Sequence, residues 1–327
     1  MTQVIRNLKV PTGNILVVAG EHGDLEFVSL GDYGKHVNLN QNKTVEDNLP
    51  LLSLTEKWVI TVSTQYGCSM GCKFCDVPKV GPGRNATVND LTMQLQTGLA
   101  LHPEITHTER LNVHLARMGE PTWNRNVLHF TDNIHNIAAP YIGGSLIHPV
   151  VSTMMPRANT KLEEFLHDWM WIKNEMFRGD AGLQLSINST NDSERDYMFS
   201  GNALPLDTIA SIGENLPHPK GRKITLNFAV AEYEINAVDL IKLFDPAKFI
   251  VKLTPMHKTA TALEHSIKTS GNYTTSYPYE HHAQALRDVG FDVLVFIASN
   301  DEDAGRITCG NAILSGSLPH KFTEISC

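Results

Sequence analysis

The sequence lacks the features that mark several broad classes of protein. No apolar run reaches the ~18 residues that a membrane-spanning helix needs. Residues 1–10 lack the basic-then-apolar pattern of an export signal. Repeats and low-complexity tracts are absent, and charged residues make up 19% of the 327, which excludes a disordered, collagenous or coiled-coil chain. We therefore expect a globular, cytoplasmic protein that is monomeric and does not contact a membrane.

Basic residues and cysteines are also scarce. The chain has 27 Lys and Arg against 35 Asp and Glu, a net charge of -8, whereas proteins that grip a phosphate backbone usually have a basic excess. Five cysteines are too few for a disulfide scaffold in a chain of this length. Three of the five, Cys68, Cys72 and Cys75, lie within eight residues, and such a cluster indicates metal binding or catalysis.

Strand and helix patterns alternate along most of the chain. Two strand-like runs, 14–18 and 25–30, flank a glycine turn and predict a β-hairpin, and residues 40–50 resemble a polar linker. Later strands are expected at 58–64, 111–116, 150–153, 183–187, 223–230, 249–254 and 293–298. Helices are expected after an N-cap at 87–90 and at 127–137, 162–172, 237–244 and 279–289. Repeated β-then-α units predict an α/β fold with a parallel sheet, either a full or partial barrel or an open doubly wound sheet.

The cysteine cluster has the spacing C-x3-C-x2-C on a loop that directly follows the strand expected at 58–64. A structural zinc site normally needs a fourth ligand and a paired C-x2-C, and neither Cys309 nor Cys327 belongs to such a pair. Three cysteines on one loop suit a [4Fe-4S] cluster that leaves one iron open for another ligand. Unligated thiols, or a zinc ion with a distant fourth ligand, remain the alternatives.

The cluster and the segments around it resemble a known family. The spacing, with Phe74 just before the last cysteine, is similar to the signature of the radical SAM superfamily. Segments that resemble its RlmN/Cfr branch, which methylates an adenine carbon in RNA, run from about residue 12 to 314; they include 62–68, 118–121, 151–153, 185–188, 191–192, 195–196, 253–255 and 308–311. The resemblance implies a partial (β/α)6 radical SAM barrel at 51–300. A small β-hairpin extension at 1–50 would precede it and a C-terminal segment at 301–327 would carry Cys309. We expect the family's helical RNA-binding domain to be absent.

The resemblance also implies a set of cofactor contacts. Cys68, Cys72 and Cys75 would hold the [4Fe-4S] cluster, and S-adenosylmethionine (SAM) would bind at its open iron. The residues implied to contact SAM are Phe74, beside the adenine; Gly119 and Glu120, at the amino group; Ser152 and Ser186, at the ribose or carboxylate; and Asn188 and His257. Asn188 stands where the family usually has His, and His257 where it usually has Asn. Taken alone, Glu120 is typical of a solvated loop carboxylate and the serines of strand-end caps.

Three features depart from the family. The family's mechanism uses two further cysteines, one that carries the methyl carbon, matched by Cys309, and one that resolves the adduct, whose place is taken by Thr61. A hydroxyl cannot replace a thiolate in forming the disulfide that releases the product. The family's general base has only loose counterparts in Glu46, Asp47 or Glu56. An acidic stretch, 299–303, stands where the family carries basic residues.

The expected function is that of a radical SAM enzyme, which cleaves SAM to a 5'-deoxyadenosyl radical and modifies a nucleobase. The substrate would be RNA, DNA or a nucleotide, and RNA adenine methylation is the reaction implied by resemblance. A flavodoxin- or ferredoxin-type donor would supply the electron. The alternatives are a rearrangement or other non-methylating reaction on a different substrate, an iron–sulfur binder without turnover, and a glycyl-radical activating enzyme.

Overall fold

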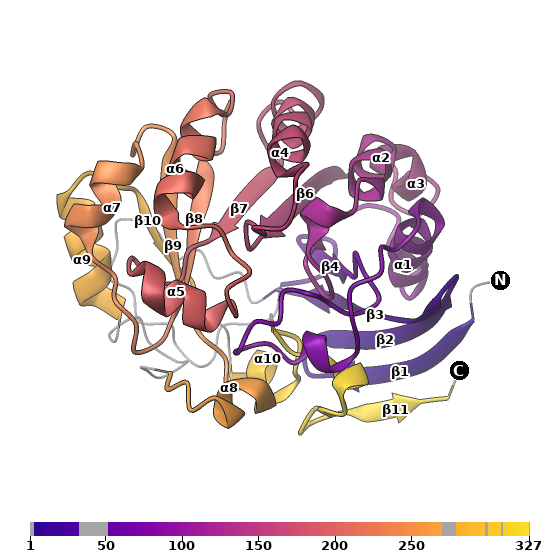
Figure 1. Cartoon of the computed structure of the whole chain (residues 1–327). Coiled ribbons are helices and arrows are strands. Elements are labelled where there is room, and N and C mark those ends of the chain that lie inside the picture. Colours follow the sequence, from indigo (N-terminus) through magenta and orange to yellow (C-terminus); the bar gives the residue numbers. More distant parts are fainter. Residues whose placement is uncertain (1–2, 33–51, 270–278, 298–299, 309, 327) are drawn as a thin grey trace.

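The computed structural model describes residues 3–32, 52–269, 279–297, 300–308 and 310–326. Its described strands form a continuous 11-stranded sheet in the order β10-β9-β8-β7-β6-β5-β4-β3-β2-β1-β11. Neighbouring strands from β4 to β10 are parallel. These strands are β4 (Trp58–Val62), β5 (Arg110–Leu115), β6 (Leu146–Thr153), β7 (Gly182–Ser186), β8 (Ile224–Val230), β9 (Phe249–Pro255) and β10 (Val293–Val295). They curve without closing, which confirms the expected α/β partial barrel (Figure 1).

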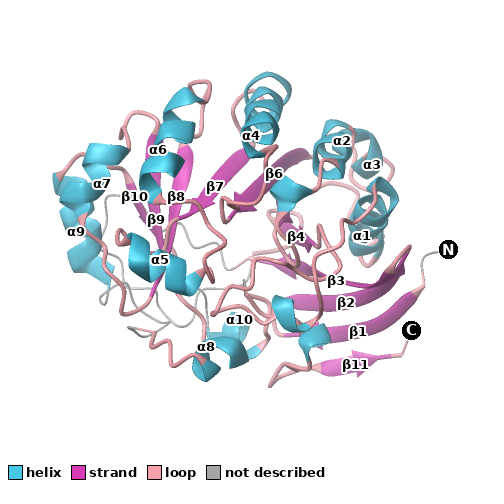
Figure 2. Cartoon of the chain, in the orientation of Figure 1, coloured by secondary structure: helices cyan, strands magenta, loops and turns pink. Residues whose placement is uncertain are grey.

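Helices cover the outer, convex face of the parallel strands (Figure 2): α1 (Val88–Ala100), α2 (Asn126–Asp132), α3 (Ile134–Ala138), α4 (Leu162–Trp171), α6 (Leu206–Asn215), α7 (Ala237–Leu243) and α9 (Glu280–Asp288). Three described helices lie elsewhere. α5 (Asp192–Met198) and α8 (Ala260–Glu264) pack with the cysteine loop, and α10 (Asn300–Ala304) contributes Glu302 to the cavity inside the curve. The predicted helix at 127–137 is two helices, because Asn133 interrupts it with a non-helical backbone. None of the described helices has the length and apolar character needed to span a membrane.

Side chains alternate across the parallel strands, which separates a packed face from an inner face. In β8, Ile224, Leu226 and Phe228 are fully buried and join the main hydrophobic core. Their neighbours Thr225 and Asn227 point the other way, because successive strand residues face opposite sides of a sheet. The apolar half of each strand therefore anchors the helices, and the other half lines the inside of the curve.

The N-terminal strands extend the same sheet in antiparallel fashion. The predicted hairpin is confirmed as β2 (Gly13–Gly20) and β3 (Gly23–Gly31), which pair in register from Gly13↔Leu30 to Gly20↔Gly23. β3 also pairs with β4, and β2 with β1 (Val4–Val10), which in turn pairs with β11 (Thr323–Ile325). β1 and β11 were not expected from the sequence, and neither were the helices α5, α6, α8 and α10. The expected linker lies outside the described residues, and the division at 50 and 300 stays a prediction.

Candidate active site

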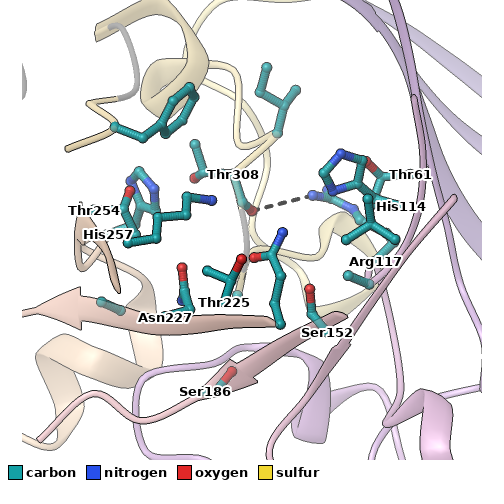
Figure 3. Close-up of a pocket in the computed structure, with 18 of the residues that line it drawn as sticks. Thr61, His114, Arg117, Ser152, Ser186, Thr225, Asn227, Thr254, His257 and Thr308 are labelled. Atoms are coloured by element: carbon teal, nitrogen blue, oxygen red, sulfur yellow. Dashed lines mark hydrogen bonds between the residues drawn. The ribbon is translucent and has the colours of Figure 1, made fainter. Parts of the chain in front are cut away.

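A cavity of about 490 Å³ lies inside the curve of the parallel strands (Figure 3). Strand carboxyl ends, the cysteine loop and the C-terminal segment all contribute to its wall. The expected site residues that line it are Cys68, Cys72, Phe74, Cys75, Gly119, Glu120, Ser152, Ser186, Asn188 and His257. The structure therefore brings together ten residues that are spread over almost 190 positions of sequence. Cys309 lies outside the described residues, but Thr308 and Gly310 line the same cavity.

Backbone hydrogen bonds hold the cysteine loop from several sides. Cys68 N–H donates to the Gly81 carbonyl at 3.0 Å, and Lys73 N–H donates to the Met198 carbonyl at 2.8 Å. At the far end of the loop, Asp76 N–H donates to the Gly310 carbonyl at 2.7 Å. The Asp76 carboxylate in turn accepts two hydrogen bonds from Thr261, at 2.9 and 2.7 Å. These contacts fix the backbone on which the three cysteines stand.

Cys68, Cys72 and Cys75 are free cysteines on one wall of the cavity. Among the described residues, no three His, Cys, Asp or Glu side chains form a group that could hold one metal ion. Burial raises the pKa of the metal-free Cys68 thiol to about 12, so metal binding there would release a proton.

Glu120 is held as a buried acceptor at the carboxyl end of β5. One carboxylate oxygen accepts from Thr122 Oγ1 at 2.7 Å and the Thr122 amide at 3.1 Å, and the other accepts from the Met154 amide at 2.8 Å. Only 1% of the residue is exposed, and burial raises the pKa of its carboxyl. Gly119 makes this turn possible: its φ is +96°, and a Cβ there would lie 2.5 Å from Gln65 Cβ. Glu120 therefore differs from the solvated loop carboxylate that was its alternative reading.

Asn188 and His257, the two exchanged positions, have protein contacts of their own. Asn188 has a left-handed backbone with φ of 61°, and its Oδ1 accepts from the Ala229 amide at 2.9 Å. This bond ties the end of β7 to β8, and Asn188 also lines the cavity. His257 Nδ1 lies 3.3 Å from Asp303 Oδ1, which links the segment after β9 to α10.

A buried ion pair joins the cavity to both ends of the chain. Arg117, directly after β5, is 4% exposed and bonds through its guanidinium to Glu26 of β3. Arg117 also donates to the carbonyls of Arg306 at 3.0 Å and Thr308 at 3.5 Å, the latter drawn in Figure 3. The second Glu26 oxygen accepts from the Leu314 amide at 3.1 Å. The segment on either side of position 309 is thereby fastened to the cavity wall.

Sequence reasoning missed most of the polar side chains inside the cavity. The wall also includes Asn112, His114, Arg117, His148, Gln184, Thr225, Asn227 and Lys252. Closed α/β barrels usually fill their interior with branched apolar residues. The available signal was the alternation of polar and apolar residues in runs such as Leu183–Ser186 and Ile224–Asn227, which indicates strands with one polar face.

Comparisons with known proteins support the resemblance. No family model matches the chain. It is 29% identical over 217 residues to the dual-specificity RNA methyltransferase RlmN of Desulfosudis oleivorans, which covers 64% of this chain and 54% of that protein. The RlmN of Syntrophus aciditrophicus is 30% identical over 199 residues, covering 59% of this chain and 51% of that protein. The chain thus spans about half the length of these curated relatives.

A solved structure supports the same assignment at the level of fold. The crystal structure of a radical SAM methyltransferase from Sphaerobacter thermophilus superposes with a TM-score of 0.66 at 19% identity. The superposition covers 95% of this chain and 80% of that one. By sequence the chain is thus similar to RlmN methyltransferases, and its fold is that of the solved radical SAM methyltransferase.

Proposed function

We propose that the chain is a radical SAM enzyme that modifies a nucleobase-containing substrate. The observation that carries the proposal is the convergence of ten residues, expected from sequence resemblance alone, on one cavity. They come from the cysteine loop and from the ends of four parallel strands. In barrels of parallel strands this carboxyl face is where active sites are built. The RNA methyltransferase activity named for the relatives supports a nucleobase as the group acted on.

Different residues of the cavity wall have different expected roles. Cys68, Cys72 and Cys75 would hold a [4Fe-4S] cluster, which, with SAM and one electron from an external flavodoxin or ferredoxin, supplies a 5'-deoxyadenosyl radical. Glu120 accepts hydrogen bonds in a buried setting, so its carboxylate suits the SAM amino group. Ser152 and Ser186 present hydroxyls at the ends of β6 and β7 for the ribose or carboxylate. Phe74, 8% exposed and edge-on to Phe199, offers an apolar wall for the adenine.

Anaerobic reconstitution tests this function. The loaded protein should contain about four irons per chain and form 5'-deoxyadenosine from SAM and dithionite. Cys72→Ala should lose the iron, and Glu120→Gln should keep the iron but bind SAM more weakly. Zinc in the purified protein, full iron in Cys72→Ala, or no 5'-deoxyadenosine from a fully loaded sample would contradict the proposal.

Two types of reaction are compatible with this fold, and residue 61 bears on which of them occurs. RNA adenine methylation follows from the resemblance and would use Cys309 as the methyl carrier. Thr61 lines the cavity on β4 where the family has its resolving cysteine, and this favours a non-methylating radical reaction. Incubation with methyl-labelled SAM distinguishes them. Label on Cys309 and then on RNA at multiple turnovers supports methylation, whereas an active Cys309→Ala variant with no label excludes it.

We propose further that the enzyme acts as a cytoplasmic monomer. Size-exclusion chromatography with light scattering tests the monomer, and a dimer mass would contradict it. Fractionation of the source cells tests the location.

A further inference from the structure

Six polar side chains of the cavity wall have no role in the proposed cofactor chemistry. They are Thr61, His114, Gln184, Thr225, Asn227 and Lys252. They lie on the inner faces of β4 and β5, which pair with each other, and of β7, β8 and β9, which are neighbours on the other side of β6. On β7 and β9 they precede the residues nearer the strand ends, Gln184 before Ser186 and Lys252 before Thr254. Gln184 and Lys252 therefore lie on the amino-terminal side of the expected SAM contacts Ser186 and His257, and we call the wall formed by these six side chains the deeper half of the cavity.

Most of these side chains face the cavity without a partner from the protein. Within the described part of the chain, the side chains of Thr61, His114, Gln184 and Thr225 take part in no hydrogen bond. Asn227 Oδ1 is buried and likewise finds no donor among the described residues. Buried polar groups are normally hydrogen-bonded, because an unsatisfied one costs free energy. This half of the cavity is therefore suited to bind a polar molecule.

The charges on the wall limit the kinds of polar molecule that can bind there. Burial and the nearby Lys252 lower the pKa of His114 to about 3, so its imidazole is neutral and offers one donor and one acceptor. Three cations on the wall pair with carboxylates: Lys57 with Asp32 at 2.7 Å, Arg222 with Asp180 at 3.1 Å, and Arg117 with Glu26. The deeper half thus offers mainly neutral donors and acceptors, together with the ammonium of Lys252.

Neutral amides and an imidazole match the edge of a heterocyclic base. A carboxamide presents a donor and an acceptor side by side, as Gln184 and Asn227 do, and this pair is complementary to a nucleobase edge. Phe296, 5.2 Å from Lys252 Nζ to the ring centroid, adds an aromatic ring to the same wall. Lys252 can complement one anionic group, such as a single phosphate.

The surroundings of the cavity disfavour a nucleobase that is part of a polymer. Glu302 of α10 lies on the wall, beside Asp301, which pairs with Lys321 at 3.2 Å, and Asp303, which lies 3.3 Å from His257. A polynucleotide brings phosphates on both sides of the base that it inserts, and these carboxylates would repel them. A mononucleotide brings only the phosphate that Lys252 can meet.

We propose that the deeper half of the cavity is the substrate subsite, and that it takes a small nucleobase-bearing molecule: a free base, nucleoside or mononucleotide. Gln184, Thr225 and Asn227 read the base edge, and Lys252 meets an anionic group where there is one. The inference rests on the proposed function, since it assumes that SAM occupies the half nearer the cysteines.

The test measures binding with the reconstituted protein and S-adenosylhomocysteine, which cannot be cleaved to the radical. Isothermal titration uses the four ribonucleoside monophosphates, their nucleosides and free bases, and a single-stranded RNA oligonucleotide. We expect at least one small probe to bind, and Gln184→Leu and Asn227→Leu to weaken it at least tenfold. Thr225→Val, which keeps shape and removes one hydroxyl, should weaken it less while preserving the fold. Asn136→Leu, at an exposed position of α3, is the matched control and should bind as the parent does.

The outcomes separate this inference from the proposed function. The subsite is overturned if no small probe binds, if the oligonucleotide binds more tightly than every small probe, or if the leucine variants weaken S-adenosylhomocysteine as much as the probe. Formation of 5'-deoxyadenosine from SAM is measured on the same preparations. Its loss in a protein that still binds a small probe contradicts the proposed function and leaves the binding site in place.

Discussion

At the scale of single residues, the buried pair of Arg117 and Glu26 makes the clearest prediction. Both side chains are almost fully buried, at 2% and 0% exposure, and each also holds backbone of the C-terminal segment. Arg117→Met leaves the Glu26 charge buried without its partner, which typically costs about 3–5 kcal/mol. We expect a large fall in the free energy of unfolding, measured by chemical denaturation.

The control for this pair is Arg125→Met. Arg125 also bonds two carboxylates, of Glu164 and Asp168, but on the exposed surface. Exposed ion pairs contribute little because water screens them, so this variant should stay close to the parent. Equal losses in the two variants would show that burial is not what makes Arg117 important.

His114 predicts how stability depends on pH. Its pKa falls from 6.5 in the unfolded chain to about 3 in the cavity, so below pH 6.5 the unfolded state binds a proton that the folded state does not. Stability from this group is full above pH 6.5 and decreases as the pH falls towards 3, by up to about 1.4 kcal/mol per unit. His114→Gln should flatten this part of the curve for the metal-free protein, followed by denaturation at several pH values. The exposed His129→Gln should leave the curve unchanged, and a similar flattening there would refute the assignment.

Single residues also show which parts of the site could be predicted from the sequence and which could not. The cysteine loop, Gly119 and Glu120 follow short local motifs, so their meeting at one cavity could be expected from resemblance. No sequence motif includes Gln184, Asn227 or Lys252. Each is a strand residue whose position on the inner face becomes apparent only from the curvature of the folded sheet. The Arg117–Glu26 pair joins residues 91 positions apart, and no local pattern reports such a contact.

At the scale of secondary structure, the start of α1 makes the next prediction. Thr87 Oγ1 accepts from the Asp90 amide at 3.1 Å, and the Asp90 carboxylate accepts from the Thr87 amide at 2.8 Å, the capping box expected from the sequence. Thr87→Ala removes the first bond, which costs about 1 kcal/mol in comparable helices. A lower melting temperature by differential scanning fluorimetry checks it. Thr97→Ala, inside the same helix, should not lower the melting temperature, because Ala favours the helix interior.

The parallel strands were predicted from local signals, whereas the missed elements include β1, β11 and the helices α5 and α6. Every β-strand from β4 to β10 was expected within a few residues, because each is a short run with apolar residues at alternating or successive positions close to a turn. β11 is a short, exposed edge strand, and its pairing with β1, from Asn7↔Ile325 to Lys9↔Thr323, joins the two ends of the chain. α5 is only seven residues long, and its N-cap Asn191 is its main local signal. Pairing across such a distance cannot be inferred from a local window.

At the scale of the whole molecule, the sheet and the C-terminal segment make the cavity a product of the entire chain. β11 closes the antiparallel edge, Arg117 and Glu26 fasten residues 306 to 314, and Asp76 fastens Gly310 to the cysteine loop. Residues from β3 to the C-terminal segment therefore contribute to one wall. A substitution near either end of the chain should therefore alter the structure of the cavity.

The charge of the whole molecule makes the last prediction. The net charge is -8, and Glu302 places a carboxylate on the cavity wall where an incoming strand would bring phosphates. Binding to RNA relies on Lys and Arg that release counterions from the backbone. We expect binding to ribosomal RNA fragments to be weak at physiological salt and to fall further as salt rises, measured by filter binding or fluorescence anisotropy. Reversal of the acidic edge in the variant Asp301→Lys with Glu302→Lys should strengthen this binding. Nanomolar affinity of the parent protein at physiological salt, or no gain from the double variant, would show that its surface charge does not govern access of RNA.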